Sequence, residues 1–159
     1  MGRNDTIATA TPISNGITNA SISPFSDPSS SGPDGDYYKL TANPGATVGV
    51  AVFAKRIFAF STLDSVLEIV DASGTRFTTC NDPVQPFLQA PAVLDPNPND
   101  FNNSCINDDN PANNTTDSDL QFKVPGTSGQ PVSFYIHVVD FRGDARPDMI
   151  YELSVSGAN

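Results

Sequence analysis

The segment 132–139, with the sequence VSFYIHVV, places Phe134, Ile136 and Val138 on one face of an extended chain. An apolar residue at every second position is typical of a β-strand with one face in the core. A period of two also marks seven further segments, namely 17–23, 37–42, 47–54, 66–70, 76–79, 120–124 and 150–155. About eight short strands without a helical stretch predict an all-β protein, an antiparallel β-sandwich.

The charged residues are few and mostly acidic. The chain has 159 residues, and we expect a single domain over 1–159. Eight Lys and Arg stand against eighteen Asp and Glu, for a net charge of -10, and the only glutamates are Glu68 and Glu152. Asp favours turns whereas Glu favours helices, so the composition excludes a helical bundle. The negative charge excludes nucleic acid as a partner, and no apolar run is long enough for membrane insertion.

Short and long connections alternate between the predicted strands. The short turns are 43–46, 71–74 and 125–131, and the long connections are 24–36, 55–64, 80–119 and 140–148. If successive strands run up and down, the long connections all emerge at one end of the sandwich. Every Asp except Asp5 and Asp71 lies in or beside a long connection, so like charges gather at that end.

Calcium would offset this charge, because it takes about six to eight oxygen ligands from carboxylates, amides and carbonyls. The first candidate group comprises Asp64, Asn107, Asp108, Asp109, Asp117 and Asp119. The second candidate group comprises Asn4, Asp5, Asp34 and Asp36. The alternative is that these are solvated turn and cap residues that hold no metal.

Two cysteines, Cys80 and Cys105, stand at the ends of a segment rich in Pro and Asn. No third Cys or nearby His accompanies them, which makes a metal site a poor interpretation. We therefore expect a disulfide that bounds an insertion at about 81–104, with two free thiols as the alternative. A disulfide implies an oxidising compartment, so we expect a secreted or cell-surface protein.

Seven short motifs follow one another along the chain. They are NDTIA at 4–8, DGDYYKL at 34–40, LDSVLEI at 63–69, NDD at 107–109, DSDL at 117–120, FYIHV at 134–138 and YELSV at 151–155. In their order and spacing they resemble the bacterial pre-peptidase C-terminal domain family, over essentially the whole chain. The resemblance implies a jelly-roll-like β-sandwich module of exported proteins, noncatalytic and often calcium-binding. Such modules are similar to the collagen-binding domains of clostridial collagenases, which bind calcium near the N-terminal linker.

The resemblance assigns roles to both candidate groups. The collagenase-type calcium role falls to Asn4, Asp5 and Asp36, with Asp34 as a neighbour. The acidic positions of the wider family are matched by Asp64, Asp108, Asp109, Asp117 and Asp119. This chain departs from the family where the insertion interrupts a hairpin, because either Asp82 or Asp108 can then take the family position. We favour Asp108, whose spacing to 117–119 is the more usual one.

These observations predict a noncatalytic, calcium-binding accessory domain. Its expected role is targeting to an extracellular protein or polysaccharide polymer, or stabilising an adjacent domain, and we expect a monomer. Catalysis is disfavoured because the sole histidine, His137, lies on a predicted strand as a surface or cross-strand residue, without a nucleophile motif. The alternative function is a carbohydrate-binding module of jelly-roll type, with Tyr37 and Tyr135 as its binding face. Residues 142–144 form an Arg-Gly-Asp tripeptide, which we interpret as an ordinary turn.

Overall fold

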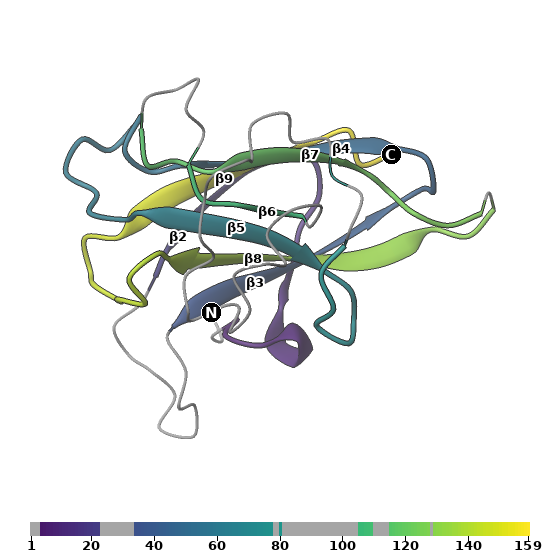
Figure 1. The fold of residues 1–159 in the computed structure, drawn as a ribbon, viewed down its shortest axis with the longest axis horizontal. Helices are drawn as coiled ribbons and strands as arrows, with labels where there is room; N and C mark the ends of the chain where they lie inside the picture. Colours follow the sequence, from purple (N-terminus) through teal and green to yellow (C-terminus); the bar gives the residue numbers. More distant parts are fainter. Residues whose placement is uncertain (1–3, 23–33, 78–79, 81–104, 110–114, 128) are drawn as a thin grey trace.

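Two β-sheets pack face to face in the computed structural model, which describes residues 4–22, 34–77, 80, 105–109, 115–127 and 129–159 (Figure 1). The five-stranded sheet has the order β1 (Thr11–Pro12), β3 (Gly35–Ala42), β8 (Val132–Asp140), β5 (Ser65–Val70) and β6 (Ile106–Asn107). The four-stranded sheet has the order β2 (Gly16–Ser21), β9 (Ile150–Ser156), β4 (Thr47–Phe53) and β7 (Asp119–Lys123). A short 3₁₀ helix, η1 (Ile7–Thr9), precedes β1. The predicted all-β sandwich is confirmed.

Seven of the eight predicted strands lie within two residues of an observed strand at each end. The prediction of a strand at 76–79 is wrong for its described part, because Arg76 forms only an isolated β-bridge, with Val70. The strands β1 and β6 were not predicted, since each has two residues and a period of two cannot show over that length. None of the helices in the described ranges is long and apolar enough to span a membrane.

The core lies between the two sheets and is formed mainly by alternate residues of β3, β4, β5, β7, β8 and β9. Phe122 of β7 and Phe134 of β8 meet edge to face with ring centroids 4.9 Å apart, so they join the two sheets. The ring of Phe77 lies 6.0 Å from each of them. Cys80 and Cys105 form the predicted disulfide, with their Cα atoms 5.2 Å apart, and Cys105 is fully buried in this core. The insertion 81–104, with Asp82, lies outside the described residues.

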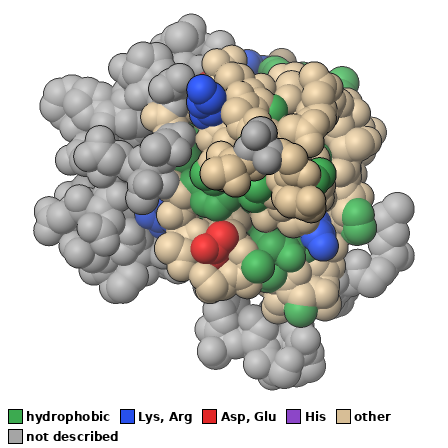
Figure 2. Space-filling view, turned by 90° about the vertical axis from the view of Figure 1, so that its right-hand side faces the viewer, with side chains coloured by type: hydrophobic (Ala, Val, Ile, Leu, Met, Phe, Trp, Pro, Cys, Tyr) green, Lys and Arg blue, Asp and Glu red, His purple; other side chains and the backbone are tan. Residues whose placement is uncertain are grey.

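The strand register places the acidic connections at one end of the sandwich, on the left in Figure 1. The pairs at this end are Ser21 with Ile150, Gly35 with Val139, Ala51 with Asp119, and Ser65 with Asp140. The predicted up-and-down alternation of β3, β4 and β5 is therefore confirmed. Figure 2 looks onto the opposite end, where apolar and uncharged side chains cover most of the described surface.

Candidate metal site

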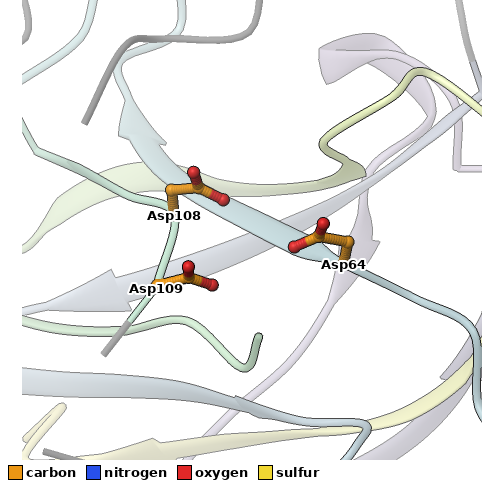
Figure 3. A group of neighbouring side chains, drawn as sticks. All are labelled: Asp64, Asp108 and Asp109. Carbon is orange, nitrogen blue, oxygen red and sulfur yellow. The ribbon is translucent and has the colours of Figure 1, made fainter. Parts of the chain in front are cut away.

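Three carboxylates, those of Asp64, Asp108 and Asp109, converge at the acidic end of the sandwich. One oxygen of each lies within 4.8 Å of the other two, and Figure 3 shows the three groups pointing toward one another. Asp64 directly precedes β5, and the two other residues directly follow β6. Since β5 and β6 are antiparallel neighbours, the start of one strand lies beside the end of the other. Strand pairing thus brings together residues that are more than forty positions apart in the chain.

The oxygens of this cluster are incompletely hydrogen-bonded. Asp108 is only 5% exposed. Its Oδ1 atom and the Oδ1 atom of Asp109 are buried and accept no hydrogen bond from the residues that the structure describes. A buried carboxylate oxygen without a donor is costly, because it has lost water and gained no partner. The three carboxylates could together hold a metal ion.

The electrostatics of the cluster agree with this geometry. Burial raises the pKa of Asp108 to about 7, and the charges of Asp109 and Asp64 add to the effect. Burial and the charge of Asp117 raise the pKa of Asp109. Burial also raises the pKa of Asp64, with a further contribution from Asp109. Three carboxylates this close favour the uptake of a positive charge, either a proton or a cation.

The main chain around Asp108 is held in place by residues that lie beside the cluster. The carbonyl of Asp108 accepts a hydrogen bond from Ser118 Oγ at 2.6 Å. The amide of Ser118 donates to Ser65 Oγ at 3.0 Å. Asn107 Oδ1 accepts from the amide of Asp119 at 2.9 Å, which ties β6 to β7. In the described contacts, therefore, the predicted ligand Asn107 links strands.

The structure does not bring Asp117 into the cluster, because its carboxylate has other partners. Asp117 is fully buried and accepts hydrogen bonds from the main-chain amides of Ala54, Lys55 and Arg56 at 3.1, 2.7 and 3.0 Å. The Nε atom of Arg56 adds an ion pair at 2.9 Å. These contacts of Asp117 therefore fix the conformation of the connection that follows β4. Asp119 starts β7 opposite Ala51 and lies outside the three-residue cluster.

The second candidate group gathers around the start of β3. The carbonyl of Asn4 accepts from the amide of Tyr37 at 2.7 Å, and Asn4 Nδ2 donates to the carbonyl of Tyr37 at 3.2 Å. Asp36 is buried and accepts a hydrogen bond from the hydroxyl of Tyr151. Burial raises the pKa of Asp36 to about 6, although the Tyr151 hydroxyl opposes the shift.

The charges of Asp34 and Asp5 also raise the pKa of Asp36, so the three carboxylates lie close enough to interact. Among the described residues, the side chains of Asp64, Asp108 and Asp109 lie close enough together to hold one metal ion, whereas those of this second group do not.

His137 is the cross-strand residue that its sequence position predicts. It pairs with Glu68 in the β5–β8 register, and its Nδ1 atom lies 2.8 Å from Glu68 Oε1. Arg76 Nε donates to Glu68 Oε2 at 2.8 Å. The ring of Tyr37 stacks on His137 with centroids 3.9 Å apart, and Tyr135 is only 8% exposed. These two tyrosines do not form an exposed aromatic row.

Sequence reasoning missed two residues beside the cluster, Asp140 and Arg142. Asp140 is fully buried at the end of β8, and its Oδ1 atom accepts from the amide of Asp64 at 3.1 Å. Arg142 is ion-paired to Asp140 at 3.1 Å. A signal was present in the sequence, because Asp140 directly follows the predicted strand 132–139 and so lies at the same end as Asp64.

The fold and the cluster define a β-sandwich with three converging carboxylates at its acidic end. Among solved structures, the chain is similar to the pre-peptidase C-terminal domain of collagenase from Bacillus anthracis, with 14% identity and a TM-score of 0.47. The similarity covers 92% of this chain and 94% of that chain. No protein-family model matches the chain, and no curated protein sequence matches it. The similar structure is a domain of the class that the sequence motifs resemble.

Proposed function

We propose that this chain is a noncatalytic, secreted accessory domain that binds calcium through Asp64, Asp108 and Asp109. The observation that carries the proposal is the convergence of three carboxylates, two of which have a buried oxygen without a hydrogen-bond donor among the described residues. A cation would supply the missing partner of both oxygens and offset the repulsion among three negative charges.

Calcium suits the cluster better than other common metals. All three donors are carboxylate oxygens, which favour a hard cation over zinc or copper. Mg²⁺ is less suited, because it demands near-ideal octahedral geometry and gives up its waters reluctantly. The three oxygens lie within 4.8 Å of one another, so one Ca²⁺ ion with metal–oxygen distances of about 2.3–2.6 Å can contact all three. Main-chain carbonyls and water would supply the remaining ligands.

Secretion is supported by the disulfide between Cys80 and Cys105, since disulfides persist mainly in oxidising compartments. We infer that the partner is an extracellular protein or polysaccharide polymer, or an adjacent domain of the same protein. In this role calcium would hold the acidic connections in one geometry and so present a defined surface at that end.

The test compares thermal unfolding of the 159-residue chain in calcium chloride and in EDTA, followed by circular dichroism. A ligand that binds only the folded state stabilises it, by about 2.7 kcal/mol at a concentration of one hundred times its Kd. We expect a higher melting temperature in calcium, and a smaller increase in magnesium at the same concentration. Coincident melting curves in calcium and EDTA would refute the proposal.

A further inference from the structure

Asp140, the last residue of β8, holds the main chain of Asp64. Its Oδ1 atom accepts a hydrogen bond from the amide of Asp64 at 3.1 Å. The amide of the next residue, Phe141, donates to the carbonyl of Asp64 at 2.7 Å. Both main-chain polar groups of Asp64 are therefore bound by the end of β8, which restricts where its carboxylate can lie.

Arg142 extends this hold through its side chain. Its Nη2 atom donates to Asp140 Oδ1 at 3.1 Å and to the carbonyl of Thr62 at 2.8 Å, and its Nε atom lies 3.4 Å from Asp140 Oδ2. A planar guanidinium can bind two acceptors at once in a fixed geometry, which an ammonium group cannot match. Because Thr62 lies two residues before Asp64, Arg142 also fixes the chain on that side of the ligand.

We propose that Asp140 and Arg142 are positioning residues for the calcium site, which raise its affinity by holding Asp64 against Asp108 and Asp109. This inference rests on the proposed function, because it concerns the same site. It assigns a role to residues that bind the main chain of Asp64 and of Thr62, two positions before it.

Contacts with Asp140 also account for the conformation of the Arg-Gly-Asp tripeptide at 142–144. The amides of Arg142 and Asp144 donate to Asp140 Oδ2 at 3.0 and 3.3 Å, so the tripeptide wraps around this buried carboxylate. Gly143 has a φ of 71°, a left-handed conformation that glycine adopts without strain. The Arg142 guanidinium is therefore engaged within the domain, through Asp140 and the carbonyl of Thr62, with its side chain 48% exposed.

Arg142 has two opposing effects on a bound cation. Its positive charge lowers the pKa of Asp64 but also repels Ca²⁺. Its hydrogen bonds hold Asp64 in place, which favours binding. Removing the charge alone would strengthen calcium binding, whereas removing the hydrogen bonds would weaken it. Two substitutions separate these effects, since Arg142→Lys keeps the charge without the guanidinium fork, whereas Arg142→Gln removes both, so that the difference between the two variants reports the charge.

The experiment is isothermal titration of the full chain with calcium chloride, using Asp108→Asn to identify the heat that belongs to this site. We expect both Arg142→Lys and Arg142→Gln to bind calcium about 10- to 100-fold more weakly than the wild type, the usual effect of removing an outer-shell partner. The matched control is Arg146→Gln. Arg146 lies in the same connection and is 45% exposed, with a 3.9 Å ion pair to Asp148, and its loss should leave the affinity unchanged.

The outcomes separate this inference from the proposed function. Wild-type affinity in Arg142→Lys, or tighter binding in Arg142→Gln, would overturn the positioning role while leaving the calcium site intact. A wild-type chain that shows no calcium heat at this site would overturn the proposed function and this inference with it. Unfolding in EDTA is measured for each variant, because a purely structural role would lower the melting temperature without changing the calcium affinity of the folded chain.

Discussion

The carboxylate of Asp117 accepts a hydrogen bond from the amide of Lys55 at 2.7 Å, although 62 positions separate the two residues in the chain. This contact sets the conformation of the connection between β4 and β5, which leads to Asp64. It also separates two kinds of acidic residue at the same end of the molecule. The oxygens of Asp117 accept hydrogen bonds from protein donors, whereas one oxygen of Asp108 has no donor in the described part of the chain.

Asp117→Ala should therefore destabilise the domain without abolishing its calcium response. The substitution leaves three main-chain amides without their acceptor, which we expect to lower the free energy of unfolding by about 3 kcal/mol. The melting temperature should fall in both calcium and EDTA, and the difference between the two conditions should persist. Loss of that difference in a variant that still folds would show that Asp117 is itself a ligand.

Asp108→Asn should have the opposite effect, removing most of the calcium response without destabilising the domain. The amide is neutral, so repulsion within the cluster falls, and we expect the free energy of unfolding in EDTA to rise by about 1 kcal/mol. Calcium should then add little, because a buried anionic ligand is lost. Asp71→Asn is the control and should keep the wild-type calcium response. Asp71 lies in the turn after β5, at the opposite end of the sandwich, where its carboxylate accepts hydrogen bonds from the amides of Ser73 and Thr75. A full calcium response in Asp108→Asn would contradict the assignment.

The stability of the metal-free domain should fall as the pH rises from about 4 to about 7. The pKa of Asp108 is raised by burial from its usual 3.8 to about 7, so the folded state binds this proton more tightly than the unfolded state does. The resulting stabilisation is complete below the unfolded pKa and is lost as the pH rises through the folded pKa. The raised pKa of Asp36, about 6, contributes in the same direction.

Denaturant unfolding in EDTA across this pH range measures the effect, and Asp108→Asn should flatten the slope. Calcium binding should strengthen over the same range, because the cation competes with the proton. A metal-free stability that rises steadily between pH 4 and 7 would contradict the raised pKa of Asp108.

Replacing both Cys80 and Cys105 by serine should lower the free energy of unfolding by about 2–4 kcal/mol, because the open chain gains freedom in the unfolded state. The calcium response should persist. The segment that leads to Asp108 is still held to the sheet, since the amide of Ile69 donates to the carbonyl of Cys105 at 2.9 Å. Thermal unfolding in calcium and in EDTA checks both statements, and an unchanged melting temperature would count against the first.

Most of the fold could be predicted from hydrophobic period, because six of the strands direct alternate residues into the core between the sheets and so repeat an apolar residue at every second position. The segment containing β8 is an example, with Phe134, Ile136 and Val138 in the core. The strands β1 and β6 could not be predicted in this way, since a two-residue strand exists only through the hydrogen bonds of its neighbour. The segment 76–79 shows the converse. Its sequence is strand-like, but in its described part Arg76 forms only an isolated β-bridge to a neighbouring strand.

The sequence by itself determined that most aspartates lie in or beside the long connections and that those connections share one end, because antiparallel strands reverse direction at each turn. Only the tertiary structure decided which of them meet. Asp108 and Asp117 look alike in the sequence, since both belong to the long connection 80–119. The pairing of β5 with β6 puts Asp108 against Asp64, whereas three amides of the β4–β5 connection take up Asp117. Carboxylate contacts at this range depend on long-range register, which no local pattern in the chain specifies.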